Sequence, residues 1–164
     1  KSLKQKHKFK HLKIADIGCG EAKIAQELVP LGYDIKSYDL VSINEYITKA
    51  DMKNLPLKNH EIDLAIFCLS LMNTNFPYFI LEANRILKNN GRLVVAEITS
   101  RVVDFNKFVK IFEILGFKLI KNMDIEGYFF ILTFVKTYNS KIKHLNKIND
   151  NYLDILKPCL YKRR

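Results

Sequence analysis

Residues 12–20, L-K-I-A-D-I-G-C-G, constrain the fold more than any other stretch of this 164-residue chain. A short apolar run, with Asp16 near its end, leads into a turn that contains Gly18 and Gly20. Residues 21–28, E-A-K-I-A-Q-E-L, follow with apolar side chains at helical spacing. A strand, a glycine turn and a helix in this order begin a nucleotide-binding α/β unit, because glycines allow a ligand to approach the backbone closely.

The glycine turn does not complete the dinucleotide pattern G-x-G-x-x-G, since Lys23 stands where the third glycine would be. This difference argues against a nicotinamide or flavin enzyme. Asp16 suits a ligand with an ammonium group, although its carboxylate could equally accept hydrogen bonds from the amides of the turn. An ordinary strand-to-helix turn remains the structural alternative.

Acidic residues end the next two predicted strands. Asp39 ends the second strand, 19 residues beyond Gly20, where a carboxylate can accept two hydrogen bonds from a ribose diol. Asp51 and Met52 follow a short third strand at residues 46–50. A carboxylate there can accept from the exocyclic amine of an adenine, while the methionine packs against the ring. The alternatives are a surface turn aspartate at position 39, and a helix N-cap with a core methionine at positions 51 and 52.

Residues 62–71 are almost continuously apolar, which predicts a central strand that is covered on both faces. Cys68 falls near the carboxyl end of this strand, where ligands bind in open α/β sheets. Its thiol could act as a nucleophile, but no histidine follows within easy reach. We therefore expect an inert thiol that lines the pocket, with residues 69–73 at the mouth of the cleft.

The second half of the sequence predicts two helices, a fifth strand and a closing hairpin. We expect helices at residues 76–87 and 104–115, and a turn at Asn90-Gly91 before a strand at residues 93–98. Two apolar segments flank the string D-I-E-G, which indicates an antiparallel β-hairpin. The fold class predicted from this order is α/β: a three-layer, Rossmann-like sandwich around a mostly parallel seven-stranded sheet that ends in an antiparallel hairpin.

The net charge of +10 is concentrated at the two ends of the chain. Residues 1–13 hold six lysines and no acidic residue, and residues 136–164 hold eight basic residues against two acidic ones. The residues between them hold 13 basic and 15 acidic side chains. Basic ends commonly bind a polyanion, for which nucleic acid is the first candidate, and solubilising termini are the alternative.

These patterns divide the chain into three parts. We expect a basic arm at residues 1–11, a cofactor-binding domain at residues 12–136, and a basic Lys/Asn-rich segment at residues 137–164 that packs on or extends the same domain. We expect residues 137–157 to be loosely ordered. The terminal string P-C-L-Y-K-R-R could stack a base and pair with phosphates.

Cysteine and histidine usage excludes several classes of site. The chain has three cysteines, Cys19, Cys68 and Cys159. Their odd number and wide spacing indicate reduced thiols in a cytosolic or nuclear compartment. His7 and His11 lie four residues apart without a third ligand nearby, so we expect no metal site. The sequence contains no run of 18 apolar residues, so we expect no membrane span. The first residue is Lys1 and not Met, so we expect a fragment of a longer chain.

Several strings of residues resemble those of one methyltransferase family. They are D-I-G-C-G at residues 16–20, D-M-x-x-x-P-L at 51–57, F-C-L-S-L-M-N-T-N at 67–75, E-A-N-R-I-L-K at 82–88 and P-C-L-Y-K-R-R at 158–164. Together they are similar to the ribosomal RNA-processing protein 8 family, also called nucleomethylin, within the class I S-adenosylmethionine-dependent methyltransferases.

The resemblance implies an enzyme of the nucleus and nucleolus that uses S-adenosyl-L-methionine and releases S-adenosyl-L-homocysteine. It implies methylation of N1 of an adenine in large-subunit ribosomal RNA, hence a role in ribosome biogenesis, and chromatin-silencing partners in animals. The alternatives are a methyltransferase of a small molecule or a protein, and a non-catalytic scaffold that binds cofactor together with RNA or chromatin.

The family's cofactor contacts correspond to five residues of this sequence. The resemblance assigns Gly18 to the methionine moiety, Asp39 to the ribose, Asp51 and Met52 to the adenine, and Cys68 to the methionine end. No residue stands out as a catalytic acid or base. None is required, because the lone pair of adenine N1 can attack the sulfonium directly once the two are aligned.

Overall fold

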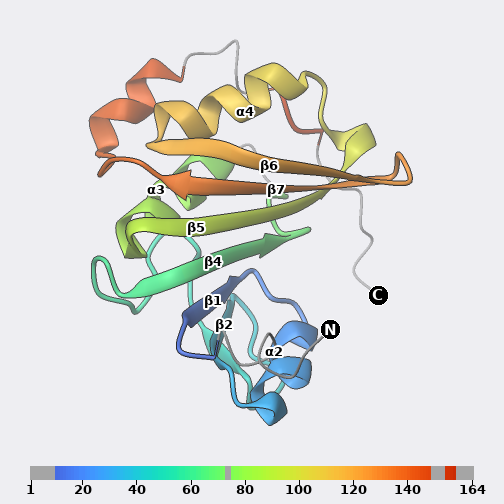
Figure 1. Ribbon diagram of the computed structural model, residues 1–164, viewed down its shortest axis with the longest axis vertical. Helices are drawn as coiled ribbons and strands as arrows, with labels where there is room; N and C mark the ends of the chain where they lie inside the picture. The colour runs from blue at the N-terminus through green and yellow to red at the C-terminus, as the bar shows by residue number, and fades with distance from the viewer. Residues whose placement is uncertain (1–9, 73–74, 149–153, 158–164) are drawn as a thin grey trace.

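The computed structural model describes residues 10–72, 75–148 and 154–157, which form a seven-stranded sheet in the order β3-β2-β1-β4-β5-β7-β6 (Figure 1). The strands are β1 (Lys13–Ile17), β2 (Asp34–Asp39), β3 (Ile47–Lys49), β4 (Ile62–Cys68), β5 (Leu87–Ile98), β6 (Phe117–Ile125) and β7 (Phe129–Lys136). Neighbouring strands from β3 through β2, β1 and β4 to β5 are parallel, while β7 is antiparallel to both β5 and β6. The predicted fold class is therefore confirmed.

Helices cover the two faces of this sheet to different extents. In the described residues the helices are α2 (Lys23–Leu28), α3 (Phe76–Ile86) and α4 (Phe105–Ile114), with 3-10 turns η1 (Val29–Leu31), η2 (Thr99–Arg101) and η3 (Ile142–Lys147). Helices α3 and α4 share one large core with the sheet. Helix α2 contributes to a smaller core over β1 and β2. None of the described helices has the length and apolarity needed to cross a bilayer.

Helix α4 illustrates how the sequence produces an element. The Asp104 carboxylate caps its start by accepting a 3.0 Å hydrogen bond from the N–H of Lys107. Phe108, Ile111 and Phe112 follow at helical spacing and are fully buried. The ring of Phe112 stacks on that of Phe134 in β7, with centroids 4.3 Å apart. Burial of each such side chain contributes about 1.5–3 kcal/mol, so packing outweighs the N-cap in fixing this helix.

One local prediction about β5 is wrong. This strand begins at Leu87 rather than at residue 93, and the expected turn at Asn90-Gly91 lies inside it. Asn90 has a positive φ of 62°, as a turn residue would, but the chain continues along the same strand. The pairing register with β4 shifts at this point, so the two residues form an irregularity within the strand rather than a connection.

The described part of the Lys/Asn-rich segment packs against the large core of the domain. Leu145 and Ile148 lie against the large core, and Ile155 and Leu156 are buried within it. Residues 1–9, 73–74, 149–153 and 158–164, which include most of the basic arm and the P-C-L-Y-K-R-R string, lie outside the described residues.

Candidate functional site

The turn after β1 holds Gly18 and Gly20 in the left-handed region of φ, at +70° and +56°. The N–H of Gly18 donates a 2.8 Å hydrogen bond to the carbonyl of Tyr38 in β2. A Cβ added at Gly18 would lie 2.5 Å from the Cβ of Ser70 and 2.9 Å from the Sδ of Met52. A Cβ at Gly20 would have no atom within 4 Å. Position 18 therefore requires glycine for close packing and for its φ, whereas Gly20 borders open space.

Asp39 joins the end of β2 to this turn. Its Oδ2 accepts a 2.9 Å hydrogen bond from the N–H of Gly20, and its Oδ1 accepts a 3.3 Å bond from the N–H of Val41. An ionised carboxylate can accept about four hydrogen bonds, so acceptor capacity remains for a pair of hydroxyl groups. The residue predicted to bind a ribose is thus fixed at the edge of the glycine turn.

Asp16 lies buried at the end of β1, and its Oδ1 has no hydrogen-bond partner in the described residues. The pKa of Asp16 is raised to about 6, first by burial and then by the negative charge of Asp39. Ser37, its register partner on β2, also has a buried hydroxyl without a partner there. Unpartnered buried acceptors are rare and costly. A carboxylate oxygen in this position fits a cationic group brought by a ligand.

Asp51 and Met52 lie close to the turn but in different environments. Asp51 is exposed, and its Oδ1 accepts a 2.9 Å hydrogen bond from the N–H of Lys53. The aspartate therefore stabilises a local turn rather than a helix N-terminus. Met52 is half-buried, and its sulfur approaches Gly18. The structure brings Met52 and Gly18 together, while contact of Asp51 with an adenine stays a prediction.

Cys68 ends β4, and its exposed side chain lies at the edge of the sheet where the glycine turn is found. Partial burial of the thiol, although the residue is exposed on one side, raises the pKa of Cys68, and the charges of Asp16 and Glu97 raise it further. The thiol is therefore protonated at neutral pH, which agrees with an inert side chain that lines the site. Ser70 and Leu71, which follow, are buried, whereas Met72 is exposed.

Two residues of this region do not stand out in the sequence. Glu97, near the end of β5, and Arg101, in η2, form a buried ion pair with a 2.7 Å distance between Oε2 and Nη1. A second guanidinium nitrogen of Arg101, Nη2, donates to the carbonyl of Leu71 at 2.9 Å. The signal in the sequence is an acidic and a basic residue four positions apart, directly after an apolar strand. Such a pair is common on surfaces, and only the structure shows that this one is buried.

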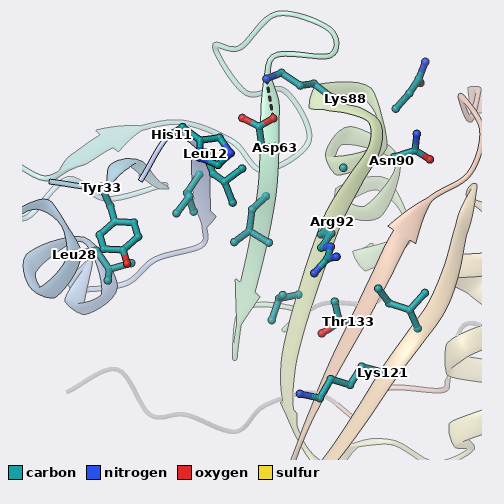
Figure 2. A pocket seen from close by; sticks show the side chains of 16 residues that line it. His11, Leu12, Leu28, Tyr33, Asp63, Lys88, Asn90, Arg92, Lys121 and Thr133 are labelled. Atoms are coloured by element: carbon teal, nitrogen blue, oxygen red, sulfur yellow. Dashed lines mark hydrogen bonds and ion pairs between the residues drawn. The ribbon is translucent and has the colours of Figure 1, made fainter. Parts of the chain in front are cut away.

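A separate groove of about 1130 Å³ lies over the sheet, with Asp63, Lys88, Arg92 and Lys121 among the residues that line it (Figure 2). Its polar rim includes a 2.7 Å ion pair between Lys88 and Asp63. None of the five predicted cofactor contacts lines this groove. His11 also lines it, and the described residues contain no cluster of three side chains suited to hold a metal ion.

Comparison with known proteins gives close relatives. Ribosomal RNA-processing protein 8 of Dictyostelium discoideum is 44% identical over 172 residues, which cover 99% of this chain and 43% of the relative. The mouse (Mus musculus) protein of the same name is 38% identical over 164 residues, or 100% and 34% of the two chains. The 25S rRNA (adenine(645)-N(1))-methyltransferase of Schizosaccharomyces pombe is 41% identical over 160 residues, or 96% and 48%. The chain thus spans less than half the length of these relatives.

Solved structures of methyltransferases share the fold at low sequence identity. The 1,6-didemethyltoxoflavin-N1-methyltransferase of Burkholderia thailandensis superposes with a TM-score of 0.67 at 12% identity, over 77% of this chain and 72% of the other. A TehB-like SAM-dependent methyltransferase of Corynebacterium glutamicum gives 0.63 at 20% identity, over 77% and 80%. These likenesses show the class I methyltransferase fold.

The profile of a family described as hypothetical methyltransferase matches residues 1–164, the whole of this chain. This match and the identities above agree with the fold and with the glycine turn. The chain therefore belongs to that methyltransferase family, whose relatives carry the name ribosomal RNA-processing protein 8.

Proposed function

We propose that this chain is the catalytic domain of an S-adenosyl-L-methionine-dependent methyltransferase that modifies N1 of an adenine in large-subunit ribosomal RNA. The observation that carries the proposal is the glycine turn with Asp39 bonded to it and the unpartnered oxygen of Asp16 beneath it. The name of the Schizosaccharomyces pombe relative supports the substrate and the position of the methyl group.

The residues around the turn fit this cofactor. The carboxylate of Asp39 would accept hydrogen bonds from the ribose hydroxyls, and Asp16 would balance the ammonium of the methionine moiety, which passes Gly18. Asp51 and Met52 would hold the adenine, and Cys68 would line the methionine end. When bound, the cofactor supplies a methyl group on an electrophilic sulfonium, and its product is S-adenosyl-L-homocysteine.

The chain's part in the transfer is to position the target base. N1 of adenine has a lone pair of its own, so no side chain has to remove a proton before attack. The base must be unpaired or flipped into the cleft, where the loop that contains Ser70 and the exposed Met72 would orient it. The basic ends of the chain would bind the RNA backbone. With this substrate the protein would act on the pre-ribosome in the nucleolus, and we propose chromatin-silencing factors as further partners.

Transfer of a labelled methyl group to ribosomal RNA tests the proposal. The wild-type protein should label large-subunit RNA from cells that lack the enzyme, and nucleoside analysis should find 1-methyladenosine. Asp39→Ala should abolish the labelling and weaken cofactor binding at least 100-fold in calorimetry, because it removes charge-assisted hydrogen bonds of about 1.5–3 kcal/mol each.

Two outcomes would contradict the proposal in different ways. Cofactor binding without methyl transfer to any RNA would indicate a scaffold, and transfer only to a small molecule or a protein would indicate a different substrate. Unchanged cofactor affinity in Asp39→Ala would refute the assignment of Asp39 to the ribose. Thr133→Ser, a small change on a strand remote from the turn, serves as the control and should leave both measurements unchanged.

A further inference from the structure

The side chain of Arg101 makes bonds in three directions from a buried position. Its Nη1 pairs with Oε2 of Glu97 at 2.7 Å, its Nη2 donates to the carbonyl of Leu71 at 2.9 Å, and its Nε donates to the carbonyl of Lys157 at 3.1 Å. The side chain is only 8% exposed. One guanidinium therefore connects the end of the sheet, the loop after β4 and the segment near the end of the chain.

The ion pair between Glu97 and Arg101 is buried, so its two charges depend on each other and on nearby backbone groups. Glu97 is fully buried, and its Oε1 has no hydrogen-bond partner in the described residues. Its Oε2 accepts a 3.1 Å bond from the N–H of Ile98 and pairs with Arg101, which supplies the opposite charge. Buried ion pairs commonly give no more net stability than apolar residues of the same size. They impose a specific geometry instead, since a guanidinium presents its donors in a rigid planar fork.

The loop bonded to Arg101 belongs to the proposed cleft. Leu71 follows Ser70, whose side chain fills the space next to Gly18 and so forms one wall of the glycine turn. Met72, the next residue, is exposed at the mouth. The bond from Arg101 to the carbonyl of Leu71 thus fixes the loop at the point where it passes from the buried core to the exposed surface.

The other segment bonded to Arg101 forms an antiparallel bridge, Val102 with Leu156, just after η2. The N–H of Lys157 donates back to the carbonyl of Arg101 at 2.9 Å, and the N–H of Val103 donates to the carbonyl of Ile155 at 2.9 Å. Ile155 and Leu156 are buried, whereas Lys157 is exposed. Arg101, which bonds the loop at Leu71, therefore also fixes the backbone of a residue that has an exposed cationic side chain.

We infer that Arg101 is a positioning residue for the RNA substrate. It holds the loop at Leu71 and the backbone at Lys157 in one arrangement, so that the cleft mouth and the cation of Lys157 form a single surface for the RNA strand. The inference rests on the proposed function. Arg101 makes no bond to the glycine turn or to Asp39, so its effect should be on the RNA and not on the cofactor.

The substitution Arg101→Lys tests this role, because lysine keeps the charge opposite Glu97 but cannot reach both carbonyls from one nitrogen. The matched control is Arg85→Lys. Arg85, in the last turn of α3, also pairs with a buried glutamate, Glu82, at 2.6 Å and donates to two backbone carbonyls. Both variants lose bonds to backbone carbonyls, but only Arg101→Lys loses bonds to the loop at Leu71 and to Lys157.

The measurements are the KM for ribosomal RNA and kcat at saturating cofactor, the Kd for the cofactor, and the Tm of each variant. We expect Arg101→Lys to raise the KM for RNA at least tenfold, with kcat within threefold and the cofactor Kd within twofold of wild type. Arg85→Lys should lower the Tm while leaving the KM for RNA within twofold. Equal KM values in the two variants, or a weaker cofactor Kd in Arg101→Lys, would overturn the inference in favour of a structural role.

A second pair of variants keeps the inference testable if Arg101→Lys does not fold. Lys157→Glu should raise the KM for RNA at least fivefold, whereas Lys143→Glu, the same change at an exposed lysine of η3, should have less than a twofold effect. Equal effects of the two changes would overturn the inference. If the wild-type protein methylates RNA but the variants of each pair behave alike, only the role of Arg101 is refuted. If the wild-type protein transfers no methyl group to RNA, the proposed function is refuted.

Discussion

The buried carboxylate of Asp16, when ionised, lowers the stability of the folded chain, and a cationic ligand can offset this loss. Its pKa is raised from 3.8 to about 6 by burial and by Asp39, so the folded state holds the proton more tightly than the unfolded state does. The resulting stabilisation is complete below pH 4 and is lost as the pH rises to about 6. At neutral pH the ionised, buried carboxylate lowers the stability of the ligand-free protein by about 3 kcal/mol.

Asp16→Asn should remove this dependence on pH. We expect the variant to gain about 1–3 kcal/mol over wild type at pH 7.5, and the difference in unfolding free energy to shrink between pH 6 and pH 4. Cofactor affinity should fall at least tenfold, because the amide carries no charge to balance an ammonium. Denaturant titrations at several pH values and calorimetry check the two effects, and unfolding curves with the same pH dependence in both proteins would contradict this account.

At the scale of elements, the glycine turn combines two different requirements. A Cβ at Gly18 would collide with Ser70 and Met52, and the φ of +70° at this position is also strained for other residues. At Gly20 only the φ of +56° opposes a side chain. Gly18→Ala should therefore cost several kcal/mol, and Gly20→Ala about 1–2 kcal/mol. Adding Ser70→Gly should recover part of the loss in Gly18→Ala but none in Gly20→Ala, as measured by the Tm. Recovery in both, or in neither, would show that the contact with Ser70 is not decisive.

The elements differ in how far their sequences predict them. Local patterns predict the strand-turn-helix unit, helix α4 and the closing hairpin, because a period, a cap or a turn residue lies within each segment. The irregularity at Asn90-Gly91 is not predictable in this way, since it depends on the register with β4. The role of Arg101 is hidden for the same reason, because its partners Leu71 and Lys157 lie far away in the sequence. Asp39 was predictable because its partner Gly20 belongs to a recognisable spacing.

At the scale of the whole molecule, charge separates a nearly neutral domain from two basic ends. If the terminal cations bind RNA, deletion of residues 162–164 should reduce the slope of log K against log salt by the equivalent of about two to three phosphate contacts. Filter binding of single-stranded RNA from 50 to 300 mM salt measures the slope. Replacement of the same three residues by glutamine should have an equal effect, and an unchanged slope would assign the tail to solubility alone.

The pairing of Val102 with Leu156 has a consequence for how this protein is made. Ile155 and Leu156 complete the core that β5 and α4 begin, so this core can close only after residue 156 has been translated. Until then, Arg101 lacks its bond to Lys157, and the loop that Arg101 holds at Leu71 is less firmly fixed.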